Sequence, residues 1–117
     1  MPVLARTLEA AGLSTLLITS MPYWAEKVGA PRTLAVEFPF GHALGPPGDI
    51  EMQRQVLTEA FIALHSIQTP GSILHSEQRW AQDMDDAIRS WQPLEPSPII
   101  AELTPKFRDM LRNRRKG

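Results

Sequence analysis

Cysteine is absent from the 117-residue sequence, and this absence excludes several classes of chemistry at once. Without a thiol the chain cannot form a disulfide, supply a thiolate nucleophile, or hold zinc or an iron–sulfur cluster through sulfur. We therefore expect that any redox reaction in which the chain takes part depends on groups supplied by another molecule.

Long apolar runs and an excess of one charge are also missing. No run approaches the roughly 18 residues of a membrane-spanning helix, and the N-terminus lacks the basic-then-apolar order of a signal peptide. The formal net charge of −1 creates no general field that would attract nucleic acid or membrane. We expect a cytoplasmic protein with no membrane partner and with nucleic acid as its least favoured partner. The basic end, which we interpret as a solvated tail, consists of Arg112, Arg114, Arg115 and Lys116.

Residues 1–70 alternate between helix and strand patterns. Helical spacing of apolar residues predicts a helix over 3–11, ended by a left-handed Gly12. Two short apolar, β-branched runs predict buried strands at 13–19 and 32–38. Because a short helix connects these strands, they are expected to pair in parallel.

Two helix starts are predicted by residues that cap N-termini. Ser20 is expected to cap the short connecting helix, and Asp49 the clearest helix of the chain, which continues to about Gln68. Beyond it, residues 72–76 are either a third strand or an extended segment. Residues 77–91 predict a polar helix.

The C-terminal segment, residues 99–117, is expected to be helical in two pieces separated by Pro105. The fold class predicted from these patterns is α/β, with a small, mostly parallel sheet and flanking helices. Two parallel strands cannot bury both faces well, so we expect a partner or self-association to complete a doubly wound sheet. The large side chains of Trp80 and Trp91 belong either to the core or to that interface.

The loop at 39–49 follows the second predicted strand. Ligands of parallel sheets bind beyond the carboxyl ends of the strands, where this loop is expected. Its glycines, Gly41 and Gly45 among them, permit positive φ angles and close backbone approach, while its prolines stiffen it. The loop is therefore either a ligand or partner loop, or a structural connection between strand and helix.

Three side chains near this loop are candidates for binding a small molecule. His42 has a side chain suited to proton transfer near neutral pH, and Glu37 could orient it or act as a carboxylate base. Arg32 could hold a substrate carboxylate through two hydrogen bonds. The structural alternatives are a surface histidine, a half-buried strand glutamate and a solvent-facing arginine.

No metal and no cofactor are predicted. His65 and His75 have no second histidine or carboxylate at a ligand spacing, and the acidic group at 83–86 lacks the glycine and ligand pattern of a calcium loop. The chain also has no G-x-S-x-G motif of a serine nucleophile.

Over residues 3–64 the sequence resembles the C-terminal part of the selenoprotein B family of glycine, sarcosine and betaine reductases. The stretches that carry the resemblance are LARTLEAAGLSTLLIT and EKVGAPRTLAVEFPFGHALGPPGDIEMQRQVL, with VGAPR, FPFG, LG, PGD and QR in that order. The resemblance implies an α/β reductase-like domain over 1–70, and we expect residues 71–117 to form a helical extension that packs on it or on a partner.

The resemblance also implies a role in reductive cleavage of a carbon–nitrogen bond of a small amino-acid-like substrate. Family members carry a selenocysteine or cysteine upstream of the helix matched by PVLARTLEAAG, and this sequence has neither. Either the chain is a fragment that starts after a UGA codon, or it docks on a chain that supplies the chemistry. In both cases we expect Arg32, Glu37, Gly41, His42 and Gly45 to contact substrate, without catalytic competence of the chain alone. The alternative is a non-enzymatic interaction subunit of a hetero- or homo-oligomer.

Overall fold

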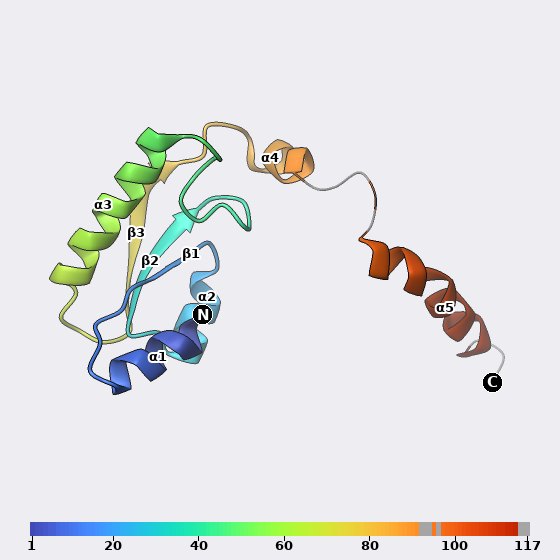
Figure 1. The fold of residues 1–117 in the computed structure, drawn as a ribbon, viewed down its shortest axis with the longest axis horizontal. Helices are drawn as coiled ribbons and strands as arrows, with labels where there is room; N and C mark the ends of the chain where they lie inside the picture. Colours follow the sequence, from blue (N-terminus) through green and yellow to red (C-terminus); the bar gives the residue numbers. More distant parts are fainter. Residues whose placement is uncertain (92–94, 96, 115–117) are drawn as a thin grey trace.

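The computed structural model describes residues 1–91, 95 and 97–114. Its helices and strands follow in the order α1 (Pro2–Ala10), β1 (Leu17–Thr19), α2 (Pro22–Val28), β2 (Arg32–Glu37), α3 (Ile50–Ser66), β3 (Ser72–Arg79), α4 (Met84–Trp91) and α5 (Pro98–Arg114). Figure 1 shows the sheet with α1, α2 and α3 around it, and α4 and α5 extending to one side.

The three strands form one parallel sheet in the order β1-β2-β3. The predicted α/β class and the predicted parallel pair of β1 and β2 are confirmed. Residues 72–76, for which the sequence allows either a third strand or an extended segment, belong to a full third strand beside β2. Residues 71–117 therefore contribute a strand as well as helices, and the domain division at residue 70 stays a prediction.

Both faces of β2 are covered. Leu34, Val36 and Phe38 pack on Val56 and Ala60 of α3 and form the core with them. Thr33 and Ala35 point to the opposite face and are buried as well. Since α2 contacts β1 and β2 and α1 contacts α2, these two helices form the layer on that second face.

The start of α3 confirms the predicted cap, because Oδ1 of Asp49 accepts a hydrogen bond of 3.0 Å from the Met52 backbone N–H. The predicted cap of α2 is wrong. Met21 holds the N-cap position, and its backbone N–H donates to Thr19 Oγ1, with Pro22 in the first turn. Because proline lacks an N–H, this helix end has fewer donors for a capping side chain to satisfy.

Two predictions in the C-terminal part are also wrong. Residues 77–79 belong to β3, and α4 begins only at Met84. Pairing with β2, in which Arg79 lies opposite Glu37, decides the structure of this segment over its local helical pattern. Moreover, α5 is one helix that contains Pro105 rather than two pieces.

Some predictions fall on residues whose side chains are not described. The side chains of Trp91, Arg112 and Arg114 lie outside the described part of the structure, as do Arg115 and Lys116 altogether. Trp80, by contrast, is partly buried and packs against the core on α3's side of the sheet.

Candidate functional site

A cavity of about 420 Å³ opens at the carboxyl edge of the sheet, on the face that α2 covers. The end of β1, the last residues of β2, the middle of β3 and the start of α4 surround it. Its lining residues are Ser20, Pro22, Ala35, Val36, Glu37, Phe38, His75 and Met84. The position agrees with the general rule that parallel α/β sheets bind ligands beyond the carboxyl ends of their strands.

Among the described residues, Glu37 is the one carboxylate that lines this cavity, and it forms an ion pair with Arg79. The two residues lie opposite each other in the β2–β3 register, after an irregularity between Ala35 and Glu37. Both side chains are 66% exposed. The edge of the sheet therefore presents a positive and a negative group next to each other and within reach of solvent.

His75 brings an imidazole to the same cavity. It lies opposite Ala35 in the register, and alternation along the strands puts its side chain on the same face as Glu37. The sequence pattern offers His75 only as a candidate metal ligand. Treating 72–79 as a strand parallel to 32–37 would have placed both His75 and Arg79 at this edge.

The loop at 39–49 folds over the end of β2 and is held by hydrogen bonds within its own backbone and by one from α3. The His42 N–H donates to the Pro39 carbonyl, and the Gly45 N–H donates to the His42 carbonyl. The Gln53 side chain of α3 donates to the Pro46 carbonyl at 3.1 Å. These contacts give the loop a defined path before any ligand binds.

Gly41 and Gly45 have the positive φ angles expected of them, +92° and +104°. At Gly45 a Cβ would lie 2.5 Å from Met52 Cγ, whereas at Gly41 nothing lies within 4 Å. Glycine at position 45 therefore allows the loop to lie close against α3, whereas glycine at position 41 allows a turn at the exposed tip of the loop.

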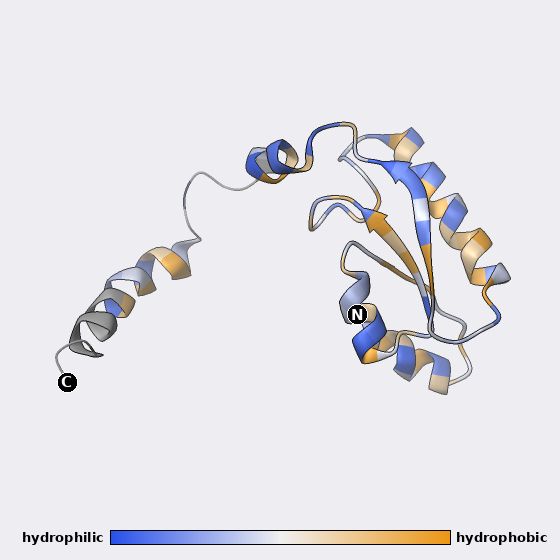
Figure 2. Cartoon of the chain, turned by 180° about the vertical axis from the view of Figure 1, so that it is seen from behind, coloured by the Kyte–Doolittle hydropathy of each residue, from blue (hydrophilic) through white to orange (hydrophobic). Residues whose placement is uncertain are grey.

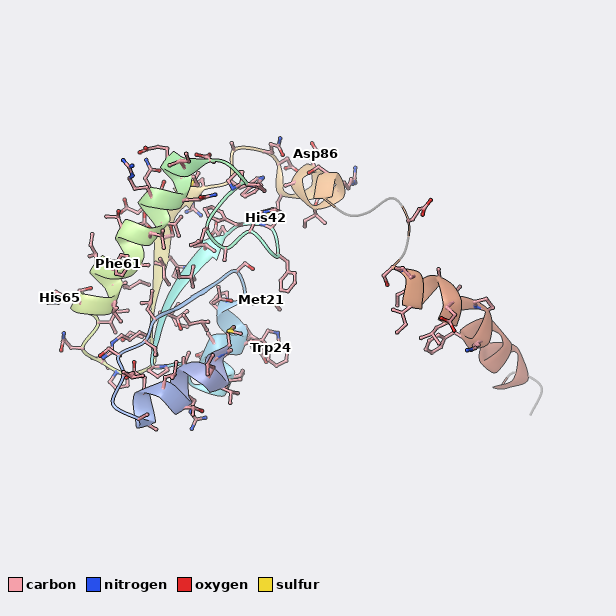
Figure 3. All side chains as sticks on the ribbon, in the orientation of Figure 1. Met21, Trp24, His42, Phe61, His65 and Asp86 are labelled. Atoms are coloured by element: carbon pink, nitrogen blue, oxygen red, sulfur yellow. The ribbon has the colours of Figure 1, made fainter. Side chains whose placement is uncertain are left out.

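His42 lies in this loop near the carboxyl end of β2 (Figure 3). Its ring contacts the Trp80 indole, with the ring centroids 5.6 Å apart, and Trp80 in turn contacts Phe38 at the same centroid distance. His42 does not line the cavity that contains Glu37 and His75. The structure thus places Glu37 and His75 in one cavity, whereas His42 packs on Trp80, which in turn contacts Phe38.

Arg32 lies at the other end of β2. Its Nη1 is 2.5 Å from Glu9 Oε1, and its Nε donates to the Ile67 carbonyl. These bonds tie α1 and the end of α3 to the start of the sheet, a full strand length away from Glu37. Of the five predicted contact residues, Arg32 is the one that the fold separates from the loop.

The pKa of Glu9 is lowered, chiefly because the Thr15 backbone N–H donates to its carboxylate at 2.6 Å. The Thr15 hydroxyl and Arg32 lower it further, while desolvation opposes them. Glu9 lies beside Arg32 at the amino end of β2, so this pKa shift concerns the stability of the fold and not the cavity.

Within the described residues, no three histidine or acidic side chains are grouped so that they could hold a metal ion. In the same part of the chain, every helix is too short or too polar to cross a lipid bilayer.

Fold and cavity together define an α/β protein with a candidate small-molecule site at the carboxyl edge of a parallel sheet. No protein-family model and no solved structure matches the chain. The chain is similar to the D-proline reductase subunit gamma of Acetoanaerobium sticklandii, with 31% identity over 72 residues. The match covers 62% of this chain and 30% of that subunit. This relative is a subunit of a reductase, which agrees with the expected resemblance to a reductase component, while selenoprotein B as the particular family stays a prediction.

Proposed function

We propose that the chain is a substrate-binding component of a reductase complex that cleaves a carbon–nitrogen bond of a small amino-acid-like compound. The observation that carries this proposal is the coincidence of two features: similarity to a D-proline reductase subunit, and a cavity at the carboxyl edge of the sheet with groups of both charges beside it. Such a pair of groups can bind the carboxylate and the cationic nitrogen of one small compound.

In this proposal Glu37 binds the cationic nitrogen of the substrate. The carboxylate of the substrate binds Arg79, which replaces Arg32 in this role because Arg32 is engaged by Glu9 and the Ile67 carbonyl. His75 contacts the substrate from the cavity wall. The loop with Gly41, His42 and Gly45 covers the ligand from the side of Trp80.

Reductive cleavage of a carbon–nitrogen bond consumes two electrons and two protons, since the carbon and the nitrogen each gain a hydrogen. The chain has no cysteine that could deliver the electrons. We therefore propose that a partner chain supplies the chalcogen nucleophile and the reductant, and that the present chain is not competent alone. This division of labour agrees with the relative being one subunit of its enzyme.

Thermal melting of the purified chain tests the binding step, with D-proline, glycine, sarcosine and betaine as probes. A probe at about 100 times its Kd should stabilise the fold by roughly 2.7 kcal/mol, and Glu37→Gln should reduce this shift. Glu26→Gln is the matched control, because Glu26 is an exposed carboxylate of α2 outside the cavity. Absence of a shift with all four probes, both alone and with the products of neighbouring genes, contradicts the proposal.

A second candidate is a non-enzymatic interaction subunit. It is favoured by an apolar cavity of about 310 Å³ between α1 and the edge strand β1, which the exposed side chains of Met1 and Leu4 line. Exposed apolar surface at a sheet edge is typical of a contact with another chain. Light scattering on the purified chain distinguishes this candidate, because a well-folded, strictly monomeric chain would count against it.

A further inference from the structure

One flank of α3 carries an apolar groove that no described part of the chain covers. The groove has a volume of about 410 Å³ and is lined by Ile50, Gln53, Arg54, Leu57, Thr58 and Phe61. Ile50 is 71% exposed and Phe61 is 69% exposed. Glu59, on the other flank, accepts a hydrogen bond from Gln78 of β3, so the groove lies on the flank of α3 that is turned away from β3.

The helix α5 carries an apolar stripe that is equally uncovered. Ile99, Ile100, Leu103 and Phe107 recur at helical spacing, and the first two and Phe107 are more than half exposed. Figure 1 shows α5 apart from the sheet, and Figure 2 shows hydrophobic residues on both α3 and α5. The stripe therefore has no partner among the elements of the sheet.

An isolated α5 is poorly stable for two reasons. Helices of about this length are marginal in water unless an amphipathic face packs on another surface. Pro105 lies in the helix interior, where its missing N–H removes a backbone hydrogen bond and its ring clashes with the carbonyl of the preceding turn. A helix with such a sequence needs a surface on which its stripe can pack.

We infer that α5 of one copy of this chain docks in the α3 groove of a second copy. The two helices match in length, since each has 17 residues, and in character, since each exposes a narrow apolar stripe. A contact between opposite charges is available, because Arg54 lies in the groove and Glu102, which is ion-paired with Lys106 one turn further along α5, lies beside the stripe. The occupant comes from a second copy because α5 extends away from α3, beyond α4, in its own chain (Figure 1).

Reciprocal docking of this kind closes a two-fold dimer by exchange of α5. The contact does not involve the cavity with Glu37 and His75. Its test is therefore independent of the proposed reductase role, and either can fail without the other.

Light scattering at increasing concentration tests the dimer with two neighbouring substitutions. Phe61→Glu puts a charge in the groove and should weaken the dimer at least tenfold. Ile62→Glu is the matched control, because Ile62 is 61% exposed on α3 but does not line the groove, and it should leave the dimer unchanged. A monomeric native chain, or equal effects of the two substitutions, overturns the inference. Circular dichroism verifies that both variants retain the helix content of the native chain.

Reversal of the charges of Arg54 and Glu102 tests whether α5 is the segment that occupies the groove. Arg54→Glu and Glu102→Arg should each weaken the dimer, and the double variant should restore part of the affinity, because the pair is then re-formed with reversed sign. Equal losses that simply add in the double variant would contradict a contact between these two positions.

Disulfide trapping distinguishes exchange between copies from docking within one chain. The native chain has no cysteine, so each introduced thiol is unique. Thr58 and Lys106 lie near the midpoints of α3 and α5, so either helix orientation brings them close. Chains with Thr58→Cys and chains with Lys106→Cys, distinguished by mass, should form a mixed disulfide on oxidation. A chain with both cysteines that closes on itself and remains monomeric overturns the inference.

Discussion

Glu37 and Arg79 form an ion pair across the carboxyl edge of the β2–β3 pair, although 42 positions separate them in the chain. The parallel register places them opposite each other, after a local irregularity that follows Ala35. Because both side chains are largely exposed, the pair adds at most about 1 kcal/mol to stability. Its position beside the cavity gives it more significance for binding than for folding.

Replacement of Arg79 should separate these two effects. Arg79→Met keeps much of the side-chain length and removes the charge, so the free energy of unfolding should fall by less than about 1 kcal/mol. Under the proposed function, affinity for a carboxylate ligand should fall by about tenfold or more, because a hydrogen bond to a charged group is worth roughly 1.5–3 kcal/mol. Isothermal titration with D-proline and urea denaturation measure the two quantities.

Arg89→Met on α4 is the control for this prediction, since Arg89 is exposed and does not line the cavity. Equal affinities of the Arg79 and Arg89 variants would remove Arg79 from the site. A loss of several kcal/mol of stability in the Arg79 variant would instead indicate a structural role.

The two loop glycines should respond differently to alanine. Gly45→Ala combines a φ of +104° with a Cβ only 2.5 Å from Met52 Cγ and 3.2 Å from Met52 Cβ. Because rotation of the Met52 side chain cannot move its own Cβ away, the loop or α3 must shift, and we expect a loss of about 1–3 kcal/mol. At Gly41 only the positive φ opposes alanine, with an expected loss of roughly 1–2 kcal/mol.

Chemical denaturation of the two variants measures which of them loses more stability. The larger loss should occur at Gly45, together with a change in the environment of Met52 that methyl NMR can detect. If Gly41→Ala were the more destabilising variant, the close approach between loop and α3 would not be what requires glycine at position 45.

The fold was largely predictable from sequence because local signals and tertiary structure agree in the first seventy residues. Asp49 caps α3, and the apolar runs at 13–19 and 32–38 contain β1 and β2. The third strand was only partly predictable. Its apolar residues are the adjacent pair Ile73 and Leu74, followed by polar residues without alternation. The helical pattern after residue 76 yields to pairing with β2, which a local pattern cannot encode.

The sequence predicts where the candidate site lies but not all of the residues that form it. The rule for parallel sheets located it at the carboxyl end of β2, and Glu37 does line the cavity there. His75 and Arg79 were missed because their placement depends on the register of β3. The separation of Arg32 from the loop follows from the same geometry, since a residue at the start of a strand lies at the opposite edge of the sheet.

Glu9 should make the stability of the fold depend on pH in the acidic range. Its pKa lies below the ordinary value of 4.5 in the folded state, so its ionised form stabilises the fold fully above that value. The contribution is lost as the pH falls from about 4.5 through the lowered pKa. The stability difference between the native chain and Glu9→Gln should therefore be largest near neutral pH and shrink below pH 4.5.

Thermal melting between pH 3 and pH 7 measures this difference, and Glu26→Gln provides an exposed carboxylate for comparison. A difference that stays constant over the whole range would show that Glu9 acts through packing and not through its charge.

Replacement of Thr33 by valine should stabilise the fold. The residue is 1% exposed at the centre of the sheet, and in the described structure its hydroxyl has no hydrogen-bond partner. A buried hydroxyl without a partner carries a desolvation penalty that an apolar group of the same shape avoids. Thr33→Val should thus raise the free energy of unfolding by about 1 kcal/mol, whereas Thr33→Ser, which keeps the hydroxyl and loses a methyl group, should lower it by about 1 kcal/mol. Urea denaturation at constant m-value measures both changes, and a Thr33→Val variant less stable than the native chain would mean that the hydroxyl is satisfied in solution, for instance by a buried water.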